Sequence, residues 1–83
     1  MYFVYILRSL KDYKYYIGCT SDLERRVNEH NSGKTLSLRN RRPLEIVYYE
    51  RYDNQTEAYK REKQIKSYKG GGSFRKLIKG EVA

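Results

Sequence analysis

The 83 residues of this chain are enough for one small domain, and we expect a single domain over residues 1–83. Lysine and arginine number 18 against 10 aspartates and glutamates, which gives a net charge of +8 at pH 7. A single cysteine excludes an internal disulfide, and one cysteine with one histidine excludes a zinc finger. With no signal peptide and no apolar run near the ~20 residues of a membrane span, we expect a basic cytoplasmic protein that does not bind membranes.

The first 20 residues predict a β-hairpin. Residues 2–7 form an apolar run rich in β-branched and aromatic side chains, whose length fits a strand better than a helix. A polar connection leads to a second such run over residues 15–19, so the two strands should pair. Tyr5 and Tyr16 lie on these strands, where tyrosine usually serves packing, and Gly18 is most simply a bend.

A helix is predicted to follow the hairpin. Ser21 precedes Glu24 by three residues, the spacing of a capping box at a helix start, and Gly33 is a suitable end. One face of this helix carries Leu23, Val27 and His30. Arg26 lies four residues before His30, so the two side chains are neighbours on the helix surface. Taken singly, each is typical of an ordinary surface or core position.

The middle of the chain predicts a loop and a third strand. Residues 34–42 are too polar and basic to pack, and Pro43 ends that loop. Residues 44–50 should form a strand, because the centre of this segment is rich in residues of high β propensity. These residues are Val47, Tyr48 and Tyr49.

Two helices are predicted to complete the chain. Asn54 stands three residues before Glu57, the spacing of a second helix cap, and the glycines at 70–72 break that helix. Ser73 is expected to cap a short last helix. Its inward side chains would be Phe74, Leu77 and Ile78. The order β-β-α-β-α-α predicts an α+β fold, a three-stranded, mainly antiparallel sheet flanked by helices.

The positive charge is concentrated after residue 33. Residues 34–83 hold 13 of the 18 basic residues and 6 of the 10 acidic ones. Such a face attracts polyanions, of which nucleic acid is the commonest, although a merely solvated surface is the simpler alternative. The candidate phosphate-binding residues are Lys34, Arg39, Arg41 and Arg42 in the loop, and Lys66, Lys69, Arg75 and Lys76 nearer the C-terminus.

Glu62 is out of place in the pattern of the second helix. It lies four residues after Ala58 and three before Ile65, so it shares their apolar face. A carboxylate there is costly unless it is paired or holds a cation. A salt bridge to a neighbouring lysine or arginine, or a helix face turned slightly toward solvent, would explain it equally well.

Taken together, these residues resemble the GIY-YIG nuclease family. The match is carried by Tyr16-Ile17-Gly18, by Arg26 and His30 at eight and twelve residues after the glycine, and by Glu62. The resemblance spans about residues 2–79 and points to UPF0213, a small stand-alone bacterial group. That group is in turn similar to the catalytic domain of structure-specific junction endonucleases.

The resemblance implies a role for each motif residue. Glu62 would be the metal ligand, holding one Mg²⁺ or Mn²⁺. Tyr5, Tyr16, Arg26 and His30 would be the catalytic residues, with Arg26 gripping a phosphate and a tyrosine activating water. Tyrosine, with an unperturbed pKa of about 10, is a poor base at neutral pH. Positive charge from Arg26 and the metal is therefore expected to lower the pKa of the tyrosine.

The sequence departs from the family pattern at two places. The first motif keeps only its tyrosine, Tyr5, because Phe3 and Val4 stand where the family has glycine and isoleucine. Position 74 is Phe, where some branches of the family carry asparagine. The second departure leaves the completeness of the active-site set open.

The function implied by the resemblance is hydrolysis of DNA phosphodiester bonds by a metal-dependent endonuclease, at branched or damaged structures in repair and recombination. Its partner would be nucleic acid, with DNA favoured, and a targeting protein would direct it. The main alternative is a non-catalytic nucleic-acid-binding module on the same fold. A basic protein–protein adaptor is a lesser alternative.

Overall fold

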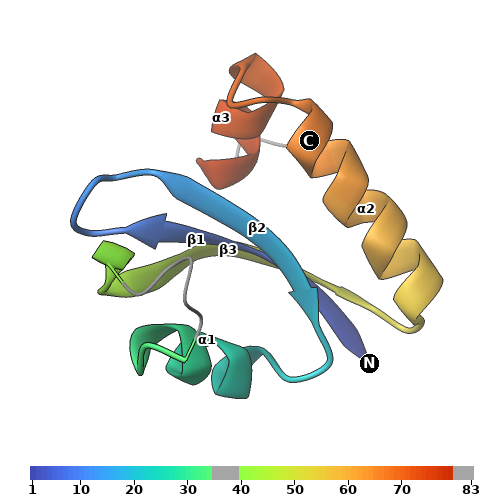
Figure 1. The fold of residues 1–83 in the computed structure, drawn as a ribbon. Coiled ribbons are helices and arrows are strands. Elements are labelled where there is room, and N and C mark those ends of the chain that lie inside the picture. Colours follow the sequence, from blue (N-terminus) through green and yellow to red (C-terminus); the bar gives the residue numbers. More distant parts are fainter. Residues whose placement is uncertain (35–39, 80–83) are drawn as a thin grey trace.

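The computed structural model describes residues 1–34 and 40–79, and these form three strands and three helices (Figure 1). The strands are β1 (Tyr2–Ser9), β2 (Tyr15–Thr20) and β3 (Leu44–Tyr52), and the helices are α1 (Leu23–Asn31), α2 (Gln55–Ser67) and α3 (Gly72–Ile78). The predicted α+β class and the order β-β-α-β-α-α are confirmed. None of the described helices has the length and apolar character required to span a membrane.

The sheet has the strand order β2-β1-β3, and both pairs are antiparallel. In Figure 1, α1 covers one face, and α2 and α3 cover the other. Because side chains alternate along a strand, the central strand β1 serves both layers. Val4 and Ile6 pack in the cluster with α2 and α3, whereas Tyr5 and Leu7 pack in the cluster on the α1 side.

The strands extend beyond their predicted ends where pairing continues. β3 reaches Tyr52 because that residue pairs with Tyr2, and β1 reaches Ser9 because it pairs with Leu44. Ser9 is fully buried, and its hydroxyl donates to the Arg41 carbonyl at 2.6 Å. This bond ties the end of the basic loop to the hairpin.

The helix caps correct two of the sequence predictions. Asp22, not Ser21, caps α1: its backbone is extended and its carboxylate accepts from the Arg25 amide at 3.1 Å. Ser73 does not cap α3, because that helix begins two residues earlier than predicted, at Gly72, and its cap position is Gly71. Asn54 caps α2 as predicted, since its side chain accepts from the Glu57 amide at 2.9 Å.

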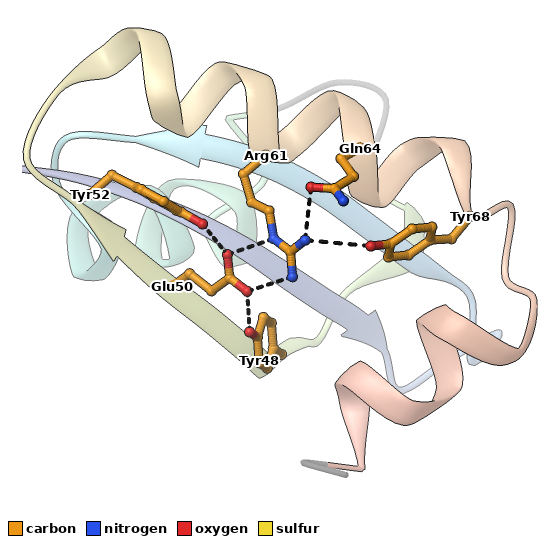
Figure 2. Close-up of polar contacts among 6 residues, drawn as sticks. All are labelled: Tyr48, Glu50, Tyr52, Arg61, Gln64 and Tyr68. Atoms are coloured by element: carbon orange, nitrogen blue, oxygen red, sulfur yellow. Dashed lines mark hydrogen bonds and ion pairs between the residues drawn. The ribbon is translucent and has the colours of Figure 1, made fainter. Parts of the chain in front are cut away.

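A network of polar side chains fastens α2 to β3 (Figure 2). The Glu50 carboxylate receives Arg61 Nε at 2.8 Å and Nη2 at 2.9 Å, a two-pronged ion pair that is less than one-fifth exposed. The hydroxyls of Tyr48 and Tyr52 donate to the same carboxylate. Arg61 Nη1 also donates to Gln64 and Tyr68 on its own helix and cap.

This network sets the rotation of α2 about its axis. Successive residues of a helix project about 100° apart. With Arg61 bound to β3, at one edge of the sheet, the next residue, Glu62, is directed away from that edge. Glu62 consequently lies on the side of β2, at the opposite edge.

Candidate active site

A cavity of about 670 Å³ lies along β2, lined by residues of β1, β2, α1 and α2. The structure brings all five predicted motif side chains to this one cavity. They are Tyr5, Tyr16, Arg26, His30 and Glu62. They come from four elements spread over 58 residues of sequence, so the fold, and not local spacing, places them together.

Tyr5 and Tyr16 lie on the same face of the hairpin. Tyr5 pairs with Gly18 and Leu7 pairs with Tyr16, so the side chains of Tyr5, Leu7 and Tyr16 project toward α1. Tyr5 is only 4% exposed, whereas Tyr16 is half-buried at the cavity wall. Tyr5 therefore combines a core position with a place at the cavity.

Gly18 makes room for the Tyr5 ring. A Cβ at this glycine would fall 2.4 Å from Tyr5 Oη and 2.5 Å from Tyr5 Cζ. Gly18 lies inside β2, and the close approach of the ring explains the glycine. The interpretation of Gly18 as a simple bend is wrong, because its role depends on a residue of the neighbouring strand.

His30 is buried and lies beside Tyr5, with its Nε2 3.2 Å from Tyr5 Oη. Burial lowers the pKa of His30 below its usual 6.5, and the nearby Arg26 guanidinium lowers it further, against a smaller opposite effect of Glu29. A depressed pKa leaves the imidazole neutral at neutral pH. His30 can thus accept a proton at this position.

The pKa of Tyr5 is raised, not lowered, in the structure. Burial is the largest cause, and it outweighs the hydrogen bonding and Coulomb attraction of Arg26, which lower the pKa. The negative charge of Glu62 raises it slightly. Arg26 acts in the predicted direction, but burial of the poorly solvated hydroxyl outweighs it, so Arg26 does not lower the pKa of Tyr5 below its usual value as expected.

Glu62 lies on the inner side of α2, as predicted, and it is paired. Lys66 Nζ lies 2.7 Å from Glu62 Oε2 across one turn of the helix. The Glu62 side chain is 17% exposed, and Lys66 is much more open to solvent. The salt-bridge explanation for a carboxylate on this face is therefore the one observed.

The residues at Glu62 suit a hydrated divalent ion. Among the described residues, no three His, Cys, Asp or Glu side chains cluster into a metal cage. Mg²⁺ or Mn²⁺ commonly keeps several water ligands and binds one or two carboxylates together with substrate phosphate. A single hard oxygen ligand at a cavity open to water fits that pattern, and Glu62 is the residue that would provide it.

The predicted phosphate-binding residues are dispersed. Lys66 lines the cavity, but Arg41 is paired with Asp12 at 3.1 Å, and Arg42 donates to the Asn31 carbonyl. The exposed remainder lie outside this cavity, at Lys34 after α1, Lys69 after α2, and Arg75 and Lys76 on α3. Arg39 falls outside the described residues.

Sequence reasoning missed several residues that line the cavity. These are Tyr15, Cys19 and Tyr59. Tyr59 could have been found, because it lies three residues before Glu62 on the same helix. Burial raises the pKa of the Cys19 thiol, and the nearby Glu62 raises it further, so this cysteine is a neutral part of the wall.

Comparison with known proteins gives consistent matches. The sequence profile of the GIY-YIG catalytic domain matches residues 1–73, which include every residue that lines the cavity. A UPF0213 protein of Haloquadratum walsbyi is 43% identical over 68 residues, covering 81% of this chain and 75% of the relative. One of Staphylococcus epidermidis is 44% identical over 68 residues, covering 81% and 82%. A UPF0213 protein of Bacillus halodurans with a solution NMR structure is 34% identical, covering 88% and 90%, with a TM-score of 0.47.

Proposed function

Since this chain belongs to the GIY-YIG family of nucleases, as its motifs predicted, we propose that it is an endonuclease that hydrolyses DNA phosphodiester bonds. The observation that carries the proposal is the convergence of Tyr5, Tyr16, Arg26, His30 and Glu62 on one cavity. A scaffold that only bound nucleic acid would have no need to bring these five side chain types together. Branched or damaged DNA in repair and recombination is the substrate we propose, with a targeting protein to direct so small a chain.

Arg26 is proposed to hold the scissile phosphate. A guanidinium presents a fork of donors that matches two phosphate oxygens, which a lysine cannot copy. Lys66 lies on the same cavity and adds positive charge near the Glu62 carboxylate. Nucleases of this family generally use divalent metal ions, and we propose one Mg²⁺ or Mn²⁺ at Glu62. Bound there, the ion would supply charge neutralisation at the phosphate and at the leaving 3′ oxygen.

Two tyrosines are candidates for activating the attacking water. Tyr5 Oη is next to Nε2 of a neutral imidazole, so the two can form a relay when the imidazole carries its hydrogen on Nδ1. In one concerted step Tyr5 would take a proton from water as it gives its own to His30 Nε2, so that His30 is the net acceptor and Tyr5 is never ionised. Tyr16 is the more solvent-accessible of the two and is the alternative base.

Cleavage assays with branched, flapped and plain duplex DNA, in Mg²⁺ and in Mn²⁺, test this proposal. Glu62→Ala and Arg26→Ala should each lower turnover at least 100-fold while the proteins stay folded. Glu57→Ala is the matched control, because this glutamate is exposed on the same helix. A pure protein that cuts none of these DNAs, or a Glu62→Ala protein that cuts as fast as the parent, would contradict the proposal.

The non-catalytic alternative is supported by one observation, the ion pair that occupies Glu62. A pure binding module would show salt-sensitive DNA binding that Glu62→Ala leaves intact, with no turnover in any metal. Metal titration separates the two functions. NMR signals of Glu62 should shift with Mg²⁺ and broaden with Mn²⁺ if the endonuclease proposal holds, and stay unchanged if the chain only binds nucleic acid.

A further inference from the structure

A second cavity, of about 520 Å³, continues from the first toward the turn of the hairpin. Tyr15, Ile17 and Lys66 line both cavities, so the two are contiguous along β2. Figure 1 shows β2 starting beneath α3 and running alongside α2. The second cavity lies at that start, between the hairpin turn and the junction of α2 with α3.

Two exposed tyrosines mark this second cavity. Tyr13, in the turn, leaves 66% of its surface exposed, and Tyr15 leaves 41%. The Tyr15 ring is held by an edge-on contact with Phe74, with the ring centroids 5.2 Å apart. Tyr15 is thus a fixed aromatic surface that solvent can still reach.

The backbone at Tyr13 is unusual for a bulky residue. Its φ of 59° is in the left-handed region, which glycine and asparagine enter with least strain. The Tyr13 ring is largely exposed, so its packing contributes little that would offset the backbone strain. Strained residues of this kind cluster at sites of function.

The charge of the second cavity matches a nucleic acid backbone. Three lysines line it, Lys14, Lys66 and Lys69, of which Lys66 is paired with Glu62 of the first cavity. Among the described residues that line it, none carries a carboxylate side chain. Aromatic rings next to a positively charged groove are the pattern of single-strand binding, in which bases stack on the rings and the cations follow the phosphates. Bases within a duplex are already stacked on each other and cannot use such rings.

We propose that this second cavity binds an unpaired nucleotide of the strand that enters the first cavity, with its base against Tyr13 and Tyr15. The proposal rests on the nuclease function and deepens it, since it names the substrate class as DNA with unpaired bases next to the scissile bond. Duplex DNA would occupy only the first cavity and would lack the stacking contact.

A tryptophan reporter tests the stacking directly. The chain contains no tryptophan, so Tyr13→Trp would introduce a single fluorophore at the second cavity. In EDTA, where no cleavage occurs, its emission should be quenched by a DNA hairpin with a thymidine single-stranded extension. A blunt hairpin, or one whose extension is abasic, should not quench it. Tyr49→Trp, at an exposed tyrosine of β3 outside this cavity, is the control and should respond to none of the three DNAs.

The affinity for the extended hairpin supplies the second measurement. Tyr13→Asn, which suits the left-handed backbone, should weaken binding about 10-fold toward the value for the blunt hairpin, whereas Tyr13→Phe should bind like the parent. Equal affinity for abasic and thymidine extensions, or no effect of Tyr13→Asn, would overturn the stacking proposal. Because cleavage plays no part in these measurements, that failure would leave the nuclease proposal standing.

Discussion

The ring of Tyr5 lies so close to Gly18, its partner on β2, that a Cβ at the glycine would fall 2.4 Å from Tyr5 Oη. The same hydroxyl is 3.2 Å from His30 Nε2. The position of one candidate catalytic group thus depends on the absent side chain of a glycine on the neighbouring strand.

Gly18→Ala should therefore displace the Tyr5 ring and destabilise the protein by about 1–3 kcal/mol, the usual cost of overpacking a buried site. Urea unfolding measures the loss, and the Tyr5 and His30 ring resonances report the shift. Gly72→Ala is the control, since a Cβ there meets nothing within 4 Å. Unchanged stability of Gly18→Ala would contradict the close approach.

The His30 ring should titrate below its usual pKa of 6.5, because it is buried and near Arg26. A depressed histidine pKa stabilises the fold above pH 6.5, and this contribution is lost as the pH falls through the folded-state pKa. His30 is the one histidine of the sequence, so a proton NMR titration reads it without ambiguity. Arg26→Gln should raise the pKa only in part, because burial is the larger cause. Titration at 6.5 or above would refute the assignment.

Glu50→Gln should cost about 3 kcal/mol of folding free energy, because it leaves Arg61 without its charged partner. Glu45→Gln, on the same strand, is the control: its pair with Arg8 is exposed, and its loss should cost much less than the loss of the Glu50 pair. Burial opposes ionisation of Glu50, but bonds from Arg61, Tyr48 and Tyr52 leave its pKa below the usual 4.5. This contribution to stability should fade as the pH falls below 4.5, and Glu50→Gln should flatten that part of the acid unfolding curve.

The two tyrosines that donate to Glu50 should make stability depend on pH in the alkaline range as well. Burial and bonding to Glu50 raise the pKa of Tyr48 and of Tyr52 to about 12 each, from 10.0. A raised pKa stabilises the fold below pH 10, and this contribution is lost between pH 10 and pH 12. Tyr48→Phe and Tyr52→Phe should each reduce the slope of stability against pH in that interval, and an unchanged slope in both variants would contradict the role of the network.

The cap of α1 gives a matched pair of surface variants. Asp22→Ala should cost about 1 kcal/mol, because it removes the carboxylate that accepts from the Arg25 amide. Ser21→Ala should change stability by less than half of that. If Ser21→Ala lowered stability more than Asp22→Ala in thermal or urea unfolding, the result would support Ser21 as the cap, as the sequence predicted.

The order of the elements follows from local pattern, which is why the fold could be predicted. Apolar runs of strand length, helix caps and glycine breaks are each contained within a few residues. The Glu50–Arg61 pair could not be foreseen, since it joins a strand to a helix across the core and no spacing rule relates the two positions. For Glu62, spacing placed the residue on the inner face of α2 but could not choose between an ion pair and a cation, because that depends on the Lys66 rotamer.

Charge was the least reliable guide to contacts. Composition groups Arg41 and Arg42 with the other loop cations, yet both bond to groups of the protein itself. Such partners belong to distant segments, the hairpin turn for Arg41 and the end of α1 for Arg42. The sequence likewise did not predict that Tyr13 and Tyr15 line one cavity. That arrangement depends on the backbone of the hairpin turn and on the contact of Tyr15 with Phe74 of α3.

Tyr5 packs with Leu7 and Leu44 in the smaller core cluster, while its hydroxyl faces the cavity. The larger cluster, under α2 and α3, contains none of these three residues. Substitutions at Leu7 or Leu44 would therefore move the Tyr5 hydroxyl without touching the larger cluster. The Tyr5 ring both packs in the core on the α1 side of the sheet and places its hydroxyl at the cavity. A change of substrate that requires this hydroxyl to move therefore also requires the α1 side of the core to repack.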